Sequence, residues 1–452
     1  MFPYRFDLGK TLGGVLAGIV FFASPAQGAM DAALRCRLGD YALSDGRTLG
    51  ITGIDGEAHD LRYTLSSGEY GRLAWSSGDD YTLGAKPGYG AVSFSDCARG
   101  TLTLREATRP DVTGRQLALP TTDTFFDSAG TRLHGKLVLP ADGKAEAIVV
   151  WIQGSDDDPA TDDEFWQYVL PLRGVGVFVY DKRGAGASQG ELSADFYQRA
   201  ADTAAAAKEA RRLAPGVARI GVFGGSQGGW VAPLTATMAD LDFVIVGYGL
   251  AEGVTAQDRD EVAEQVRAAG YGDDVLAKVR EITDATTRIV KSGWKDGWPE
   301  FATVKQKYSA EPWYKVIGGV NGYTGVMLNT PIEQIKEMGP KLDKHVSFNY
   351  DPRPVIATIA PRQLWILGGA DHTAPNARTV EILGDIQKTK PNLDLAIYKD
   401  ADHGIVETFA FEGASRHRYP ASWFDLVARW ILTDTLPPAD NNLQIVRGAV
   451  AR

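Results

Sequence analysis

The sequence predicts an α/β protein in which a mostly parallel β-sheet carries helices on both faces. Three observations lead to this fold class. Continuous apolar runs recur from about residue 120 onward, helical segments alternate with them, and a serine ringed by glycines joins one run to the next helix. Strands that are covered on both faces are apolar along their whole length, because neither side meets water.

The individual elements follow from this alternation. A hairpin at 124–139, with its turn at 127–130, leads into the sheet. The apolar runs that we predict as buried strands are 147–153, 175–180, 218–223, 243–248, 363–367 and 393–398. The helical segments between and after them are 161–172, 193–213, 227–239, 376–388 and 419–433.

Two regions lie outside this predicted core, which occupies 119–250 and 356–452. Residues 30–118 contain short alternating runs separated by turn pairs, which is typical of a small β-rich module. Residues 251–355 replace the alternation with a mainly helical pattern. Because this insertion follows the carboxyl end of a strand, where such sheets bind ligands, we expect it to be a helical cap.

The insertion is rich in aromatic residues, and three of its tryptophans are candidates for binding substrate. They are Trp294, Trp298 and Trp313. A cap that borders a pocket would present some aromatic rings to the substrate. The alternative is a structural helical subdomain whose aromatic residues form an ordinary core, and the sequence leaves both interpretations open.

Composition and charge narrow the choice of partners. The 452 residues exceed one ordinary domain, and the net charge is −10 at pH 7 without a long basic run. Nucleic acid and anionic membrane surfaces are therefore poor candidate partners. The sequence has too few cysteines for a metal cluster and no histidine-rich tract, so we expect a small-molecule substrate and neither a metal nor an organic cofactor. It does not indicate an oligomeric state.

The amino-terminal residues 1–29 predict an export signal. Arg5 and Lys10 precede a short apolar, glycine-rich stretch, and small residues follow it near Gly28. The stretch is too short to cross a bilayer comfortably, although an uncleaved anchor or a disordered start is the alternative. We therefore expect an exported protein, periplasmic or secreted, without stable membrane insertion after cleavage.

The chain has only two cysteines, Cys36 and Cys97. In an oxidising compartment they are candidates for one disulfide bond. Two unrelated buried thiols are the alternative.

The glycine-ringed serine is Ser226, within the segment 224–229 of sequence Gly-Gly-Ser-Gln-Gly-Gly. A serine in a tight turn between a buried strand and a helix has the form of a nucleophile elbow. Gly224 and Gly228 place no Cβ where the strand and the helix crowd together. The helix amino terminus adds positive potential. The alternative is a glycine-rich turn whose serine only caps the helix.

A serine nucleophile needs an adjacent base, and two histidines follow the last two predicted strands. We predict that His403 is the base and that Asp371 is the carboxylate that holds its tautomer, which gives the chain order Ser226, Asp371, His403. His372 is the weaker candidate for the base, because it is the immediate neighbour of Asp371. For either histidine alone, an ordinary loop residue is the alternative.

The oxyanion of the tetrahedral intermediate also needs N–H donors, and losing one typically costs about 2.7–4 kcal/mol. The backbone N–H of Gln227 is one candidate. The second is the N–H of Ser155, in the loop Gln-Gly-Ser-Asp-Asp-Asp at 153–158, where Gly154 allows close approach. The three aspartates of this loop favour a solvated acidic turn over a metal site.

A further glycine-rich segment, 181–188, follows the second predicted strand. It is only weakly similar to a phosphate cradle, because it lacks the Gly-Lys-Ser/Thr ending. We predict a scaffold role in which Asp181 and Arg183 join loops by charge-assisted hydrogen bonds.

Together these segments resemble the α/β-hydrolase superfamily over about residues 120–435. The resemblance is carried by 224–228, the turn at 181–188, Gly-Ala-Asp at 369–371 and Asp-His-Gly at 402–404. Within the superfamily, secreted bacterial esterases and the catalytic domain of prolyl-oligopeptidase-like enzymes are the most similar. The resemblance implies the nucleophile, acid and base named above. The chain departs from many members at 153–154, where it has Gln-Gly in place of His-Gly.

The resulting hypothesis is a serine hydrolase that cleaves small-molecule carboxylic esters through an acyl-enzyme. A serine peptidase on the same fold ranks second, because about 90 residues before the core cannot build the β-propeller of prolyl-oligopeptidase-like enzymes. A thioesterase follows. A binding protein without turnover is the hypothesis of a different class, and it would be expected to lack a triad residue.

Overall fold

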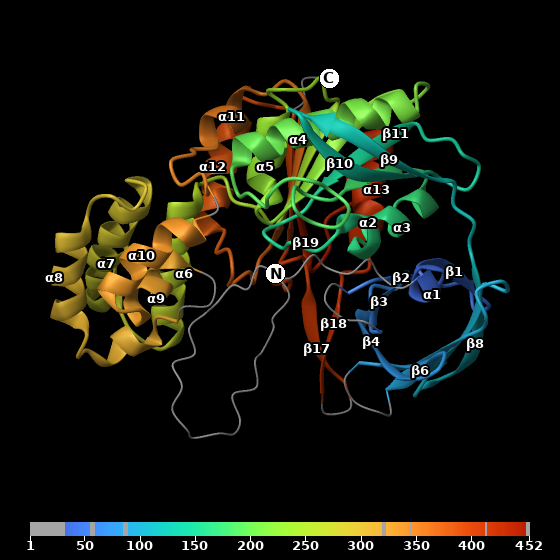
Figure 1. Cartoon of the computed structure of the whole chain (residues 1–452), viewed down its shortest axis with the longest axis horizontal. Helices are drawn as coiled ribbons and strands as arrows, with labels where there is room; N and C mark the ends of the chain where they lie inside the picture. The colour runs from blue at the N-terminus through green and yellow to red at the C-terminus, as the bar shows by residue number, and fades with distance from the viewer. Residues whose placement is uncertain are drawn as a thin grey trace.

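The computed structural model describes residues 32–54, 59–84, 89–318, 322–343, 345–411 and 414–448. These residues form an amino-terminal barrel, a large mixed sheet with its helices, and a group of inserted helices (Figure 1). The predicted export signal at 1–29 lies outside the described residues, so export stays a prediction. Within the described ranges, no helix is both long and apolar enough to cross a bilayer.

The predicted β-rich module is a closed antiparallel barrel of eight strands in chain order. Alternate side chains of these strands fill its interior, with Tyr41 and Leu49 among the buried residues. Closure depends on the pairing of β1 with β8, where Tyr41 lies opposite Gln116. A disulfide joins Cys36 and Cys97, whose Cα atoms are 5.7 Å apart. The strands are β1 (Gly39–Leu43), β2 (Thr48–Thr52), β3 (Leu61–Leu65), β4 (Tyr70–Ser77), β5 (Asp80–Leu83), β6 (Gly90–Phe94), β7 (Thr101–Glu106) and β8 (Arg109–Gln116), preceded by α1 (Ala32–Arg35).

The central sheet has nine strands in the order β19-β16-β15-β14-β13-β11-β12-β10-β9. The six strands from β16 to β12 are parallel, whereas β10, β9 and β19 pair antiparallel at the two edges. The prediction of a mostly parallel sheet is therefore confirmed. Its strands are β9 (Thr121–Ser128), β10 (Thr131–Val138), β11 (Ala147–Ile152), β12 (Gly176–Tyr180), β13 (Arg219–Gly225), β14 (Phe243–Gly247), β15 (Arg362–Gly368), β16 (Leu393–Tyr398) and β19 (Leu443–Val446).

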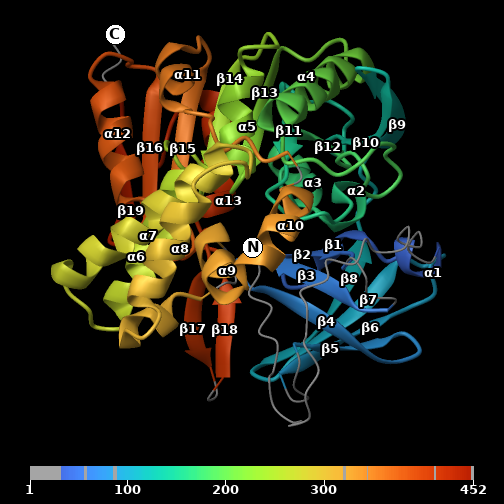
Figure 2. The ribbon, with the colours of Figure 1, turned by 60° about the vertical axis from the view of Figure 1, so that its left-hand side comes forward.

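Helices cover both faces of this sheet (Figure 2). In β11, Ile148 and Val150 pack on the face of α4 and α5, while Val149 and Trp151 pack on the face of α3 and α13. Helix α4 begins at Phe196, because the Asp195 side chain caps the first free N–H groups. The helices are α2 (Ala160–Asp163), α3 (Trp166–Val169), α4 (Phe196–Leu213), α5 (Gly228–Thr235), α11 (Arg353–Thr358), α12 (Ala377–Gln387) and α13 (Trp423–Thr433).

Two parts of the structure differ from the predicted elements. The predicted helix at 161–172 is divided into α2, α3 and a 3-10 turn at Pro171–Arg173, because the chain turns at Glu164, which is extended. A hairpin of β17 (Glu407–Phe411) and β18 (Ala414–Arg418) follows the last core strand. Alternation alone did not separate this hairpin from the loop before α13.

The insertion between β14 and α11 is helical, as predicted, and has its own hydrophobic core. Figure 1 shows its helices grouped beside the central sheet, on the other side from the barrel. The helices are α6 (Val254–Ala268), α7 (Asp273–Lys291), α8 (Trp298–Tyr308), α9 (Tyr323–Asn329) and α10 (Ile332–Leu342), with a 3-10 turn at Pro312–Val316.

The barrel packs on the sheet domain near the carboxyl ends of the parallel strands. The Gly53 N–H donates to the carbonyl of Asp162, and the Tyr419 N–H donates to the carbonyl of Gly68. The rings of Tyr70 and Tyr419 are stacked with centroids 4.5 Å apart. On the sheet domain these contacts come from α2, which follows β11, and from the segment after β18, so the barrel borders the edge of the sheet where Ser226 is expected.

The turn at 181–188 is a scaffold, as predicted. Asp181 is buried and its Oδ1 accepts hydrogen bonds from the N–H and Oγ1 of Thr161 at 3.0 and 2.9 Å. Its Oδ2 lies 2.9 Å from Nδ1 of His134. Arg183 donates to both carboxylate oxygens of Asp202, at 2.8 and 2.7 Å. The segment therefore joins β10, α2 and α4 to the end of β12.

The histidine of this network predicts a pH-dependent stability. Burial alone would lower the pKa of His134, but its hydrogen bonds to Asp123 and Asp181 outweigh burial and raise that pKa to about 9. A folded-state pKa above the ordinary value of about 6.5 means that the stabilisation is complete below about pH 6.5 and is lost as the pH rises through about 9.

We therefore expect the free energy of unfolding in urea to fall between about pH 6.5 and 9. The His134→Gln variant, which cannot be protonated, should show a smaller fall over the same range. Equal slopes for the two proteins would contradict this assignment.

Candidate active site

Ser226 lies in a strained turn between β13 and α5. Its φ is 53°, in the left-handed region that residues with side chains rarely adopt. A Cβ on Gly224 would lie 2.1 Å from the carbonyl oxygen of Gly228, and one on Gly228 would lie 2.4 Å from that of Ile152. The two glycines therefore have the role that the sequence predicted, and the turn has the geometry of a nucleophile elbow.

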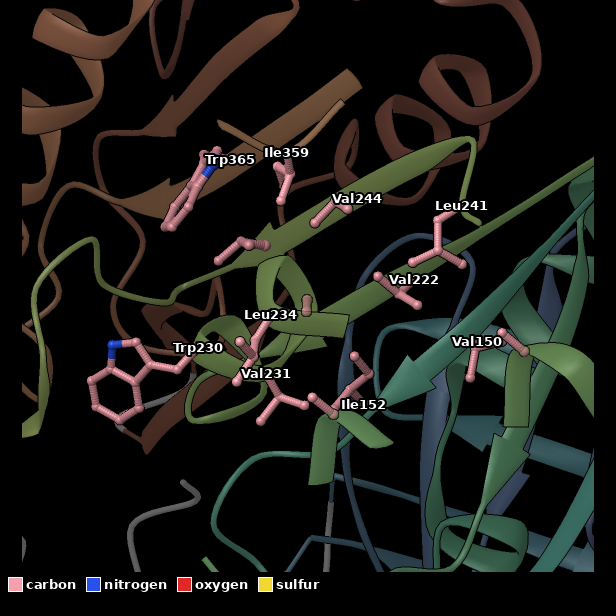
Figure 3. Close-up of a cluster of buried hydrophobic side chains, with 14 of the residues drawn as sticks. Val150, Ile152, Val222, Trp230, Val231, Leu234, Leu241, Val244, Ile359 and Trp365 are labelled. Atoms are coloured by element: carbon pink, nitrogen blue, oxygen red, sulfur yellow. The ribbon is translucent and has the colours of Figure 1, made fainter. Parts of the chain in front are cut away.

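The turn rests on a well-packed core. Figure 3 shows Val231 and Leu234 of α5 near side chains of the central strands, among them Ile152, and Trp230 and Val222 belong to the same buried cluster. All of these side chains are buried. A rigid support of this kind fixes where the Ser226 hydroxyl points, because closely packed side chains cannot shift independently.

The structure brings the three predicted triad residues together. Ser226 Oγ is 3.0 Å from Nε2 of His403, and Nδ1 of His403 is 2.9 Å from Oδ2 of Asp371. Each residue lies in a loop that follows a parallel strand: β13, β15 or β16. The His403 tautomer that donates its Nδ1–H to the Asp371 carboxylate leaves Nε2 free to accept the serine proton.

The carboxylate of Asp371 is itself held in place. Its Oδ1 accepts the N–H groups of Thr373 and Ala374, at 3.0 and 2.7 Å. The Asp371 side chain is 1% exposed and that of His403 is 5% exposed. Low exposure strengthens the interaction between them, because little water screens it.

The alternative base and acid lie elsewhere. The His372 side chain is 72% exposed, and its Nδ1 lies 3.6 Å from Glu264 of α6. Asp402 accepts the backbone N–H groups of His372 and His403, at 3.2 and 2.8 Å, so it shapes the two loops and does not bind the imidazole. The choice of His403 and Asp371 over their neighbours therefore agrees with the geometry.

The loop after β11 lies against the nucleophile. A Cβ built on Gly154 would be 3.3 Å from Cβ of Ser226, so the backbone of this loop is in close contact with the nucleophile. Gln227, directly after the nucleophile, begins the turn into α5. The loop after β11 and the start of α5 thus flank Ser226, and the oxyanion roles of the Gln227 and Ser155 N–H groups stay predictions.

The aspartates of this loop are held by protein contacts. The Gln153 side-chain amide donates to Oδ1 of Asp156 and to the carbonyl of Asp158, at 3.0 and 2.9 Å. Asp158 also lies 3.8 Å from Arg62 of the barrel. Across the described ranges, no group of three or more potential ligand side chains has a metal-binding arrangement.

Two buried cations behind the loop were not predicted to act at the site. Arg199 of α4 contacts the Gln153 carbonyl and the Gln227 side chain, and Lys182 contacts the Gly154 carbonyl. Burial lowers the pKa of Lys182 to about 8, although nearby Asp156 opposes this shift. Lys182 is the second residue after a predicted strand, which is a usable signal, whereas Arg199 lies within a helix and has no local signature.

Tyr248 is a further residue that sequence reasoning missed. It follows β14 with φ 44°, and its ring meets that of His403 edge-on with centroids 5.1 Å apart. Its hydroxyl is so close to Gly225 that a Cβ there would lie 2.4 Å away. Burial raises its pKa well above the ordinary value, so the phenol remains a neutral donor beside the nucleophile.

The tryptophans predicted to bind substrate do not contact the triad. Trp313 is 2% exposed within the core of the insertion, and Trp294 and Trp298 pack against that same core. Trp294 donates its indole N–H to Asp343, and Trp298 donates to the Trp294 carbonyl. The burial of Trp313 corrects its role from substrate binding to packing, whereas a substrate role for the partly exposed Trp294 and Trp298 stays a prediction.

Comparisons with known proteins give remote structural similarity only. Neither protein-family models nor curated proteins match the chain. Similar solved structures include an esterase of Pyrococcus furiosus, with 15% identity, a TM-score of 0.39, and coverage of 64% of this chain and 84% of that chain. An acylaminoacyl peptidase of Pyrococcus horikoshii has 15% identity, a TM-score of 0.43, and coverage of 89% and 57%. An alpha/beta hydrolase from Penicillium has 17% identity, a TM-score of 0.39, and coverage of 63% and 92%.

Because these identities and scores are low, the fold assignment rests on the chain's own topology. The parallel strands, the strained serine turn after β13 and the later loops that carry Asp371 and His403 occur in the order typical of one superfamily. The chain has the fold of an α/β hydrolase.

Proposed function

We propose that the protein is a serine hydrolase that cleaves carboxylic esters through an acyl-enzyme on Ser226. The observation that carries this proposal is the hydrogen-bonded row from Ser226 through His403 to Asp371. A row of this kind raises the nucleophilicity of a serine, which is weak at its ordinary pKa.

The proposed reaction proceeds in two halves. Ser226 Oγ attacks the ester carbonyl carbon while its proton moves to Nε2 of His403, and the charge that develops on the carbonyl oxygen is stabilised by backbone N–H groups. The intermediate collapses, the C–O bond to the alcohol breaks, and His403 protonates the leaving alcohol. Water then attacks the acyl-enzyme with His403 as base, and the acid product and free Ser226 are released.

A peptidase remains the second candidate, with a thioesterase behind it. The amino-terminal module supports this ranking, because its described residues form a filled eight-stranded barrel and not a propeller. The row of three side chains would serve amide or thioester cleavage equally well, so the substrate has to be tested directly.

The insertion supports a further part of the proposal, in which its helices act as a cap that influences substrate choice. Gln257 of α6 donates to the Thr373 carbonyl at 3.4 Å, and Glu264 of α6 lies near His372. Both contacts are with the loop that carries Asp371. Helix α6 therefore contacts the loop that carries Asp371, which supports a cap role for the insertion.

Labelling with a fluorophosphonate probe tests the nucleophile. The wild type should be labelled, and Ser226→Ala should not, because the phosphorus must bond to an activated serine oxygen. Ser155→Ala is the matched control, since it removes a nearby hydroxyl but keeps the backbone N–H. Equal labelling of Ser226→Ala and the wild type would falsify the assignment of Ser226.

Parallel assays on p-nitrophenyl acyl esters and aminoacyl-nitroanilides test the ester preference. We expect ester turnover to exceed amide turnover, with both abolished in Ser226→Ala. Amide turnover as fast as ester turnover would move the peptidase hypothesis to first place. Tight binding of an acyl compound without any turnover would favour a binding protein.

Removal of the insertion tests the cap. Gly253 and Tyr350 are adjacent, since a Cβ on Gly253 would lie 2.4 Å from the Tyr350 carbonyl oxygen, so a short Gly-Ser linker can replace 254–349. We expect the shortened protein to change its preference across esters from acetyl to dodecanoyl. Retained fluorophosphonate labelling would show an intact core, and an unchanged preference in that labelled protein would make the insertion a structural subdomain.

A further inference from the structure

Two buried cations lie directly behind the loop that borders Ser226. Arg199 is 4% exposed and Lys182 is 7% exposed. In the part of the chain that the structure describes, the closest carboxylate to Lys182 is Asp156 at 3.7 Å, and none lies within 4.0 Å of Arg199. A buried charge without a close counter-ion, such as that of Arg199, is costly, so its retention calls for a specific role.

Both cations donate to carbonyl groups of that loop. Arg199 Nη2 donates to the Gln153 carbonyl at 2.5 Å, and Lys182 Nζ donates to the Gly154 carbonyl at 3.3 Å. Arg199 Nη1 also donates to the side-chain oxygen of Gln227. One guanidinium therefore joins the loop after β11 to the residue that follows the nucleophile.

The geometry of the peptide bond converts these contacts into an orientation of N–H groups. The C=O and N–H of a trans peptide point in opposite directions, and no described peptide is cis. Drawing the Gln153 carbonyl towards Arg199 turns the Gly154 N–H away from Arg199. Drawing the Gly154 carbonyl towards Lys182 turns the Ser155 N–H away from Lys182 in the same manner.

From this arrangement we infer that Arg199, together with Lys182, is a positioning residue that aims the oxyanion amides at the substrate carbonyl oxygen. This inference rests on the proposed function, because it assigns a task within ester cleavage. The positive charges add to the effect, since a cation in a site with little water stabilises a nearby developing oxyanion. Neither side chain reacts with the substrate.

The test compares Arg199→Met with a matched variant, Arg219→Met. Arg219 also holds two backbone carbonyls, those of Ile431 and Leu432 at 2.7 and 2.9 Å, but it lies at the opposite end of β13 from Ser226. Both variants thus lose a guanidinium that donates to two oxygen atoms, although Arg199 is more deeply buried than Arg219 and one of its acceptors is a side-chain oxygen. They differ in their distance from the oxyanion loop.

For hydrolysis of a p-nitrophenyl ester, we expect kcat of Arg199→Met to fall at least about tenfold with KM within about threefold. Losing one oxyanion donor entirely lowers kcat by roughly 10²–10³-fold. A donor that is kept but points in the wrong direction should lower kcat by less. Arg219→Met should keep kcat within about threefold of the wild type. Arg199→Lys should recover part of the lost kcat, because it restores the charge and one contact.

Several outcomes would overturn the inference. A folded Arg199→Met protein with the kcat of the wild type would do so. Equal losses of kcat in Arg199→Met and Arg219→Met, or a change in KM with kcat unaltered, would do the same. If Arg199→Met does not fold, Lys182→Met takes its place with the same expected split between kcat and KM. Fluorophosphonate labelling of the wild type separates the two hypotheses: an unlabelled wild type contradicts the proposed function, whereas a labelled wild type with an unaffected Arg199→Met contradicts only this inference.

Discussion

The hydrogen bond between His403 and Asp371 is the contact on which the rest of the site depends. It joins loops that follow two adjacent parallel strands, β15 and β16, and it fixes the imidazole so that Nε2 faces Ser226. The contact exists only because the carboxyl ends of parallel strands meet at one edge of a sheet. A sheet with one of these strands reversed would place the carboxylate at the opposite edge. The catalytic hydrogen bond therefore requires the parallel order of these strands.

Assembling this edge has physical costs that the core offsets. Ser226 and Tyr248 both have positive φ, which costs on the order of 1–3 kcal/mol for each residue. The buried Arg199 and Lys182 and the dry Asp371 carboxylate add desolvation costs. Two apolar layers, one on each face of the sheet, hold these groups in place, and Figure 3 shows part of one of them. The strained residues thus lie at the end of strands that are buried on both faces, which is the arrangement expected of a preorganised site.

Sequence reasoning reached the strands, the elbow and the three triad positions, because each has a local signal: an apolar run, a glycine-ringed serine, or a polar residue just after a strand. The closure of the barrel was not predicted, because Tyr41 and Gln116, which pair across it, lie in strands that are far apart in the sequence. Sequence reasoning misjudged Trp313, because a buried ring and a pocket ring look alike in sequence. It missed Arg199, whose role appears only when α4 is packed beside the loop after β11.

The most direct test of the account is to trap the covalent intermediate. The enzyme would be quenched in acid during turnover of a slowly hydrolysed ester, then digested and mapped by mass spectrometry. The account predicts that the acyl mass is found on the peptide that contains Ser226, and that Asp371→Asn accumulates it far more slowly. Turnover with no acylated peptide, or with the acyl group on another residue, would contradict it.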